Sequence, residues 1–223
     1  LLISLFARMG FSAISELIVY FLVVAGVLLL HFLVSYGLIV RFIANINPVT
    51  FYKRMAPVMA YGFSTSSSNA TLPITLETVE HKLGVKKEIA SFTVPLGATI
   101  NMDGTAIMQG VATVFIASAY NIDMSFTDYL LVILTATLAS IGTAGVPGVG
   151  LIMLALVLDQ VGLPVEGIGL IIGVDRLLDM MRTSVNVTGD AAVSAVVARS
   201  ENKFDMAVFE DNRIQDQVVQ KSS

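Results

Sequence analysis

Five apolar segments, separated by short polar connections, make up most of the chain before a polar C-terminal stretch. Residues 17–40 form the first complete segment, which has no formal charge and one histidine, His31. At about 1.5 Å per residue, a helix of this length crosses the roughly 30 Å apolar core of a bilayer. The pattern therefore predicts a membrane-spanning helix over 17–40, preceded over 1–16 by the end of another helix and a connection. We expect His31 to be a hydrogen-bonded structural residue rather than a proton relay.

Basic residues indicate that the second segment, residues 55–80, enters and leaves the membrane on one side. Lysine and arginine flank it at both ends, and such residues accumulate in cytoplasmic connections. Its centre, STSSSNATLP over Ser64–Pro73, is a poor helix interior, and each arm is long enough to reach only about the middle of a bilayer. We therefore predict a re-entrant helical hairpin with a serine-rich tip. The flanking residues are Arg41, Lys53 and Arg54 before it and Lys82, Lys86 and Lys87 after it.

The remaining segments repeat this arrangement from the opposite side. Residues 89–120 cross the membrane and are interrupted at Asn101–Gly104, where polar residues and a glycine favour an unwound turn. The connections on either side of residues 130–158 contain no lysine or arginine, so this segment returns to the outer side. Its centre, SIGTAGVPGVG over Ser140–Gly150, holds four glycines and a proline and predicts a second hairpin tip. Residues 168–198 then cross back, with a second polar break predicted at Asn186.

The predicted fold is an all-α membrane protein built as an inverted repeat of a re-entrant helical hairpin and a broken transmembrane helix. Residues 1–45 carry the end of one transmembrane helix and one full transmembrane helix, residues 46–125 the first repeat, and residues 126–200 the second. Residues 201–223 form a polar cytoplasmic tail, whose end we expect to be disordered or a solvated helix. Inverted repeats with broken helices and a site at the membrane midplane are typical of secondary transporters. Two tips and two breaks should therefore converge on one site.

Five polar residues in the last segment, all on one helix face, predict where this site lies. Their spacings of 4, 3, 4 and 4 residues place them within an arc of roughly 80° of an α-helix. A charge in the middle of a bilayer costs on the order of 2.5–3.5 kcal/mol on insertion scales, so we expect this stripe to face the protein interior. The residues of the polar stripe are Asp175, Asp179, Arg182, Asn186 and Asp190.

The composition supports a membrane protein rather than a soluble one. The 223 residues are 55% hydrophobic and 13% charged, with a mean hydropathy of +0.80, whereas soluble domains carry about 25% charged residues. A net charge of −4 and the lack of a basic cluster with interleaved aromatics give no sign of a nucleic-acid partner. The sequence has no cysteine, which excludes disulfides and thiolate metal sites. Leu1 begins within an apolar pattern, so we expect an N-terminally truncated chain.

The polar residues of the breaks and the stripe indicate what the site binds. Oxygen ligands from two asparagines and two aspartates suit a hard ion such as sodium better than a transition metal. Arg182 offers a planar fork for a carboxylate, Asp179 can take an ammonium group, and the N–H groups of the serine tip suit a second carboxylate. Together these groups describe aspartate or glutamate. The alternative is that Arg182 pairs internally with Asp179 or Asp175 and binds nothing. The oxygen ligands belong to Asn101, Asp103, Asn186 and Asp190.

Four motifs carry a resemblance to a known family: SSSNATLP, NMDGT, SIGTAGVPG and DMMRTSVNVTGD, in this order within about residues 1–205. They resemble the glutamate/aspartate transporter family, the dicarboxylate/amino acid:cation symporters, of bacterial or archaeal type. The resemblance implies a sodium-coupled symporter and not an enzyme, with an elevator mechanism in which the second hairpin is the extracellular gate. It also implies a multi-pass protein of the cell (inner) membrane, in contact with lipid, that forms a homotrimer through scaffold helices absent from this chain. By the same resemblance, we expect this chain to lack the family's third helix, which contributes to one sodium site.

The resemblance further assigns roles to individual residues. Arg182 is similar to the residue that binds the side-chain carboxylate of the substrate, and Asp179 to the one that binds its amino group. Other substrate contacts are implied for Thr105, Thr183 and Asn186, for Ser67 and Ser68 of the first tip, and for Val146 and Gly150 of the second. One sodium site is implied for Gly97, Asn101, Asn186 and Asp190, and part of another for Asn101 and Asp103. A third site, built from carbonyls, is implied for Thr99, Ser140, Ile141 and Thr143.

Some positions depart from the family pattern and keep alternatives open. Members with acidic substrates commonly carry a second arginine where this chain has Ser66 or Met180. Met108 and Gln109 stand where animal glutamate carriers have tyrosine and glutamate, which leaves proton and potassium coupling open. The nearest alternative is a C4-dicarboxylate symporter coupled to sodium or protons, although such substrates have no amine for Asp179. More distant alternatives are an intramembrane aspartyl protease and a passive anion channel.

Overall fold

The computed structural model describes residues 12–211, with side chains from residue 15 onward. Within this range every regular element is a helix, apart from one isolated β-bridge between Val85 and Phe204. The all-α class predicted from the sequence pattern is therefore confirmed. Residues 1–11 and the tail beyond residue 211 lie outside the described residues, whereas residues 12–16, where a helix end and a connection were predicted, already belong to the first long helix.

The first helix runs without interruption over residues 12–43 and contains two π-helical turns. It consists of α2 (Ser12–Leu30), η1 (His31–Ser35), α3 (Tyr36–Leu38) and η2 (Ile39–Ile43). Among the described residues, only the stretch Ser15–Ile43 is a helix long and apolar enough to cross a membrane. Tyr20, Val24 and Leu28, spaced four residues apart, are buried on its inner face. Many other leucines and valines of this helix are exposed, so its outer face is apolar and uncovered.

A helix pair follows, and the serine-rich stretch forms its turn. α4 (Pro48–Thr65) begins at Asn47, whose side-chain oxygen accepts hydrogen bonds from two backbone N–H groups of the first turn. It ends at Ser66, which has the left-handed conformation with φ of 52°. Ser67 then caps α5 (Ser68–His81), since its hydroxyl oxygen accepts from Ala70 N at 3.1 Å. Two serines therefore suffice to reverse the chain, and the helices are longer than the predicted arms, at 18 and 14 residues.

A broken helix and a second helix pair come next. α6 (Lys87–Ile100) and α7 (Asp103–Ala119) are separated by Asn101 and Met102, whose backbone angles are not helical. α8 (Phe126–Ile141) starts with a capping box between Ser125 and Asp128, and α9 (Val149–Gln160) runs back against it. The turn between them covers residues 142–148 and ends at Gly148, which has a φ of +77°. A short 3-10 turn, η3 (Val165–Gly167), leads into the last long helix.

The last long helix, α10 (Ile168–Ser200), is unbroken, so the break predicted at Asn186 is wrong. Two of its hydroxyl groups donate back to carbonyls of the same helix. Thr188 Oγ1 donates to Ser184 O at 2.7 Å, and Ser194 Oγ donates to Asp190 O at 2.7 Å. The helix contains no proline, and its polar side chains project into the protein without cost to the helical hydrogen bonds. The inner face of α10 therefore offers side chains to the site, and not freed carbonyls.

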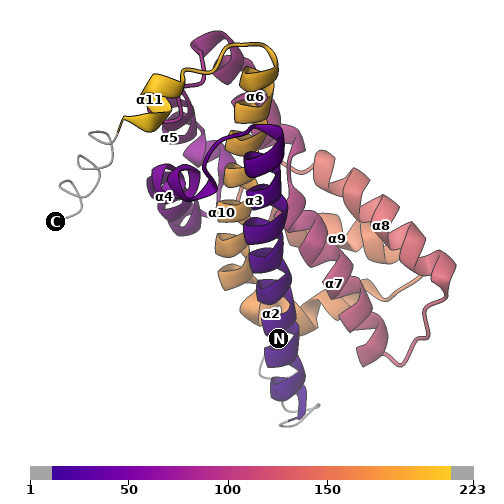
Figure 1. The fold of residues 1–223 in the computed structure, drawn as a ribbon. Helices are drawn as coiled ribbons and strands as arrows, with labels where there is room; N and C mark the ends of the chain where they lie inside the picture. The colour runs from indigo at the N-terminus through magenta and orange to yellow at the C-terminus, as the bar shows by residue number, and fades with distance from the viewer. Residues whose placement is uncertain (1–11, 212–223) are drawn as a thin grey trace.

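α10 is the central element of the fold (Figure 1). The pair α4–α5 and helix α6 pack along one side of it, α7 and α9 pack along the other, and α2–α3 runs beside it (Figure 1). Two apolar clusters result, one around Ile116 and Leu154 and one around Met55 and Ala191. The polar stripe of α10 lies between these clusters, and both turns of the helix pairs approach it.

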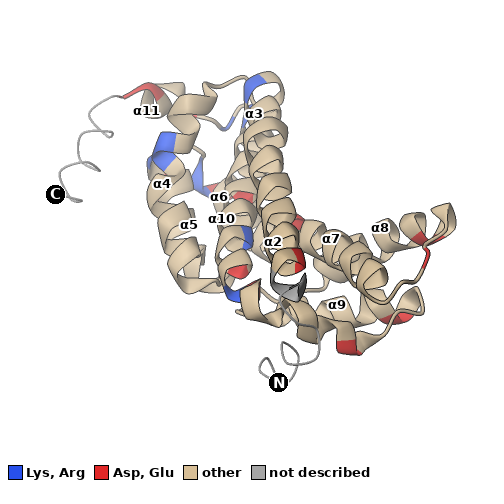
Figure 2. Ribbon diagram, turned by 90° about the horizontal axis from the view of Figure 1, so that it is seen from below, with Lys and Arg blue, Asp and Glu red and all other residues tan. Residues whose placement is uncertain are grey.

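The chain after α10 folds back onto the base of the first pair. α11 (Met206–Glu210) places Phe209, 2% exposed, beneath the buried guanidinium of Arg54 at 5.4 Å. Arg54 Nη1 also donates to Lys82 O at 2.6 Å, and Nη2 donates to Asp211 O at 3.1 Å. Lysines and arginines gather at this end, whereas acidic residues mark the α7–α8 connection and the end of α9 (Figure 2). This asymmetry supports the predicted orientation with the C-terminal end on the cytoplasmic side, which stays a prediction.

Candidate functional site

The two turns of the helix pairs meet directly, and Gly145 is the residue between them. Its carbonyl oxygen accepts hydrogen bonds from Ser67 Oγ at 2.6 Å and from Asn69 N at 3.1 Å. A Cβ atom at Gly145 would lie 2.9 Å from Asn69 Oδ1 and 3.1 Å from Ser68 Cβ, so only glycine allows this approach. Turns that lie 78 residues apart in the sequence therefore close over the same part of α10.

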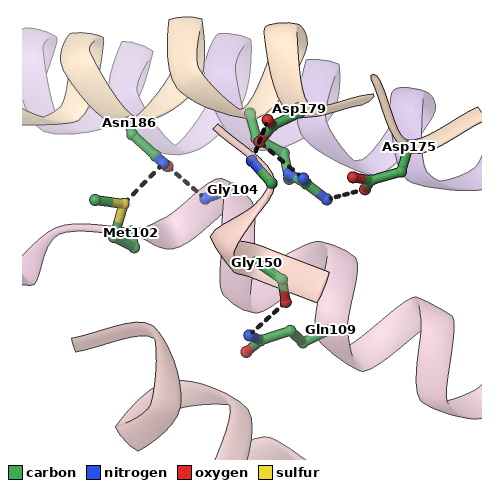
Figure 3. Close-up of polar contacts among 9 residues, drawn as sticks. Met102, Gly104, Gln109, Gly150, Asp175, Asp179 and Asn186 are labelled. Atoms are coloured by element: carbon green, nitrogen blue, oxygen red, sulfur yellow. Dashed lines mark hydrogen bonds and ion pairs between the residues drawn. The ribbon is translucent and has the colours of Figure 1, made fainter. Parts of the chain in front are cut away.

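Arg182 lies beneath this contact and is paired with two carboxylates. Its Nη1 donates to Asp175 Oδ1 and its Nη2 to Asp179 Oδ1, both at 2.9 Å (Figure 3). The second oxygen of Asp179 accepts from Gly148 N at 3.0 Å, which ties α10 to the second turn. The guanidinium is 1% exposed. The internal pairing considered for Arg182 is thus present, with Asp175 and Asp179 together rather than with one of them.

A small cavity surrounds this ion-pair cluster. Its volume is about 10 Å³, which is room for roughly one water molecule. All of the predicted substrate residues except Ser67 line it. The lining residues are Ser66, Ser68, Met102, Thr105, Thr143, Ala144, Gly145, Val146, Val149, Gly150, Asp179, Arg182, Thr183 and Asn186. An amino acid can enter only when the two turns separate, because the turns fill the remaining space.

Two polar atoms of the cavity wall have unused hydrogen-bonding capacity. Ser66 Oγ and Arg182 Nε are both buried, and neither has a partner among the described residues. Buried polar atoms are almost always satisfied in folded proteins, so unpaired atoms that border a cavity point to a ligand or ordered water. Ser66 is also the position where a second arginine is found in some members of the resembled family.

Four of the predicted sodium ligands come together next to this cavity. Asn101 Nδ2 donates to Asp190 Oδ1 at 2.9 Å and to Asn186 O at 3.2 Å. Gly97 lies so close that a Cβ atom there would be 2.6 Å from Asp190 Oδ1. The side-chain oxygen of Asn186 accepts from Gly104 N at 2.8 Å, and its amide faces Met102 Sδ at 3.3 Å (Figure 3). The break between α6 and α7 is therefore held against the intact α10 by two asparagine side chains.

Asp103 lies at the start of α7 and has partners from the first helix. Tyr36 Oη donates to its Oδ2 at 3.0 Å, and His31 Nε2 lies 3.1 Å from the same oxygen. The expectation that His31 is hydrogen-bonded is met, and its partner is one of the predicted sodium ligands. Tyr36 carried no signal in the sequence beyond its place in an apolar helix, because the contact spans 67 residues.

Among the described residues of the third predicted ion site, one hydrogen bond joins two members, from Thr143 N to Ser140 O at 3.2 Å, and no side-chain hydrogen bond does. Thr99 is exposed on α6 and its hydroxyl donates to Pro95 O at 3.0 Å. Ser140 and Thr143 are buried and donate to carbonyls of α8, to Thr137 O and Ala139 O respectively, each at 2.8 Å. Ile141 is 44% exposed. The site stays a prediction.

The ligand atoms that the site offers to a cation are oxygens, which prefer hard ions. The described residues contain no group of three or more histidine, cysteine, aspartate or glutamate side chains placed to hold a metal ion. Next to Asn101, the carboxylate of Asp190 and the backbone carbonyl of Asn186 converge instead, and such oxygens suit an alkali cation. Gln109, which is fully buried, donates weakly from Nε2 to Gly150 O at 3.5 Å (Figure 3). It adds a neutral amide near the second turn.

Comparisons with known proteins agree on one family. A model of the sodium:dicarboxylate symporter family matches residues 1–200. An excitatory amino acid transporter of Caenorhabditis elegans is 46% identical over 181 residues, which cover 81% of this chain and 36% of that protein. Excitatory amino acid transporter 3 of Bos taurus is 46% identical over 184 residues, which cover 82% of this chain and 35% of that protein. Excitatory amino acid transporter 1 of Rattus norvegicus is 42% identical over 182 residues, which cover 82% of this chain and 34% of that protein. The chain spans about a third of the length of these curated relatives.

Proposed function

The chain belongs to the sodium:dicarboxylate symporter family, and we propose that it carries the substrate and ion sites of a sodium-coupled symporter for aspartate or glutamate. Members of this family are transporters and not enzymes, so the protease alternative is set aside. The observation that carries the proposal is the buried Arg182, paired with two carboxylates beneath two turns that are joined at Gly145. Relatives with about 45% identity are named amino acid transporters, which supports an amino acid as substrate.

The pairing of Arg182 provides positions for both ends of an acidic amino acid. Asp175 accepts a single hydrogen bond from Nη1 of Arg182, and a substrate carboxylate can take this position on the guanidinium. The substrate's ammonium group then compensates the charge of Asp179, which is held in place by Gly148 N. A substrate carboxylate without an amine adds a negative charge beside Asp175 and Asp179, which already share the single guanidinium of Arg182, and this excess of buried negative charge is costly. This difference favours an amino acid over a C4-dicarboxylate.

The proposed sodium ligands are connected to the substrate cavity through Asn186. Its side chain lines the cavity and accepts from Gly104 N, while its carbonyl accepts from Asn101, which also donates to Asp190. A sodium ion bound by the oxygens of Asn101, Asn186 and Asp190 requires Asn101 to turn its oxygen inward. This rearrangement moves the α6–α7 break, which borders the cavity, and gives sodium binding a direct effect on substrate affinity.

The remaining features of the proposal concern the whole protein. We propose that the α8–α9 pair is the extracellular gate, because its turn supplies both Gly145 and Gly148 to the closed site. The elevator motion, the homotrimer, the re-entrant depth of both pairs and the cell-membrane location belong to the same proposal. They rest on family membership, since this chain corresponds to about a third of the relatives.

Binding of aspartate to the native gene product that contains this sequence tests the proposal. Calorimetric titrations are made with aspartate, glutamate and succinate, each in sodium and in choline. We expect aspartate or glutamate to bind only in sodium, with an affinity that rises steeply with sodium concentration. Asp190→Asn should raise the sodium concentration that aspartate binding requires. Equal binding in choline would refute sodium coupling, and binding of succinate alone would establish the dicarboxylate alternative.

A further inference from the structure

Asp103 is held by two donors on one of its two oxygens. Tyr36 Oη at 3.0 Å and His31 Nε2 at 3.1 Å both approach Oδ2. Oδ1 makes no hydrogen bond to any described residue. Two donors on one oxygen fix the rotation of the carboxylate, and the free oxygen is left to accept a cation.

The first helix reaches Asp103 because of its π-helical turns. η1 (His31–Ser35) ends immediately before Tyr36, and η2 (Ile39–Ile43) begins three residues after it. A π turn holds one more residue than an α turn, so it changes by about 100° the direction of the side chains that follow. His31 and Tyr36 thereby face the same carboxylate and pack edge-to-face, with ring centroids 4.7 Å apart. π turns inside helices are frequent at functional sites.

Tyr36 also lies against the proposed sodium ligands around Asn101 and Asp190. A Cβ atom at Gly189 of α10 would collide with Tyr36 Oη and would lie 2.5 Å from Asn101 Nδ2. The absence of a side chain at position 189 therefore lets the hydroxyl and this amide lie together on α10. Tyr36 is 2% exposed and stands between Asp103 on one side and the turn of α10 that carries Asp190 on the other.

We propose that Tyr36, together with His31, is a positioning residue for sodium binding at Asp103. The two donors hold Oδ2 while Oδ1 is presented to the ion, and neither residue touches the substrate cavity. The inference rests on the proposed function, in which Asp103 is a sodium ligand. It adds residues of the first helix to a site otherwise built from α6, α7 and α10.

Tyr36→Phe removes only the hydroxyl and is the first test, made in the native gene product that carries this chain. One of the two hydrogen bonds that orient the carboxylate is lost while the contact with His31 remains, so we expect about a three- to tenfold increase in the sodium concentration needed for half-maximal aspartate binding. Aspartate affinity at saturating sodium should stay unchanged. The matched control is Tyr20→Phe, on the same helix and equally buried, whose hydroxyl has no partner among the described residues. It should leave the sodium dependence unaltered.

The partner histidine gives an independent test if Tyr36→Phe does not fold. His31→Leu should weaken sodium binding, whereas His31→Gln keeps a donor and should restore most of it. A Tyr36→Phe protein with unchanged sodium dependence, or a loss of substrate affinity at saturating sodium equal to the loss for sodium, overturns the inference. Equal effects of leucine and glutamine at position 31 also overturn it.

Asp103→Asn separates this inference from the proposed function. If Asp103→Asn weakens sodium binding and the Tyr36 and His31 variants do not, the positioning role is wrong and the sodium site stands. If Asp103→Asn leaves the sodium dependence unchanged, the assignment of Asp103 as a sodium ligand fails, and the positioning role fails with it.

Discussion

We expect the two turns to close again over a bound substrate, and replacement of Gly145 by alanine tests whether their contact then contributes to substrate affinity. The new Cβ would lie 2.9 Å from Asn69 Oδ1 and 3.1 Å from both Asn69 N and Ser68 Cβ. Asn69 N and Ser68 Cβ belong to the first turn of α5, and they cannot rotate away as the end of a long side chain would. The turns must therefore move apart.

The expected cost follows from the hydrogen bonds at this contact. Separation removes the bonds from Ser67 Oγ and Asn69 N to Gly145 O, which are 2.6 and 3.1 Å long. Each bond contributes about 0.5–1.5 kcal/mol, so the closed form loses roughly 1–3 kcal/mol. Because each 1.4 kcal/mol changes a dissociation constant about tenfold, aspartate affinity at saturating sodium should fall by roughly 5- to 140-fold.

The assay is calorimetric titration of aspartate at saturating sodium, and Gly142→Ala is the matched control. Gly142 lies in the same turn, and a Cβ atom there meets only Ala139 O at 3.8 Å, an ordinary contact. The control should bind aspartate within about twofold of the native protein. If Gly145→Ala and Gly142→Ala bind equally well, the turns do not need to touch for substrate binding, and the reasoning fails.

Three further changes test other parts of the structure. Arg182→Ala should abolish aspartate binding and leave sodium binding largely intact, as measured by sodium-dependent protection from heat; equal loss of both would assign the arginine to the fold. Asp190→Asn should raise the sodium concentration required for aspartate binding at least tenfold in the same titrations, and an unchanged requirement would exclude Asp190 as a ligand. Arg54→Ala removes the buried partner of the Phe209 ring and of two carbonyls, and should lower the free energy of unfolding by about 2–4 kcal/mol. The matched control is Lys53→Ala at the exposed neighbouring position, which should change the melting temperature little.

The local features of the chain were readable from the sequence because they depend on residues within about one helical turn. The serine-rich turn at Ser66 and Ser67, the glycine-rich turn at 142–148 and the break at Asn101 all follow from helix-breaking and capping residues. The periodicity of the polar stripe also placed Asp175, Asp179 and Arg182 on one inward face of α10, where they are buried. The motifs in these segments sufficed to indicate the family, which the match over residues 1–200 confirms.

The local sequence pattern gave a wrong prediction in α10, where the same polar residues are compatible with an unwound turn or with a helix. NVTGD in α10 resembles an unwound turn as much as a helix, since threonine and asparagine can bond either to a neighbouring backbone or across to another element. Packing decided for the helix. Asn186 bonds across to Gly104, and the hydroxyl of Thr188 returns to Ser184 O, so no backbone group of α10 had to be freed.

The contacts that make the site depend on tertiary structure alone. Gly145 meets Ser67 across 78 residues, Tyr36 meets Asp103 across 67, and Asn101 meets Asp190 across 89. No periodicity or propensity extends over such separations, because each is set by which helix faces pack together and by how closely glycine lets two backbones approach. The sequence determined the turns, the inward stripe and the family. The packing of α2–α3, α7 and both turns around an unbroken α10 decided which charges are paired and which oxygens stay free.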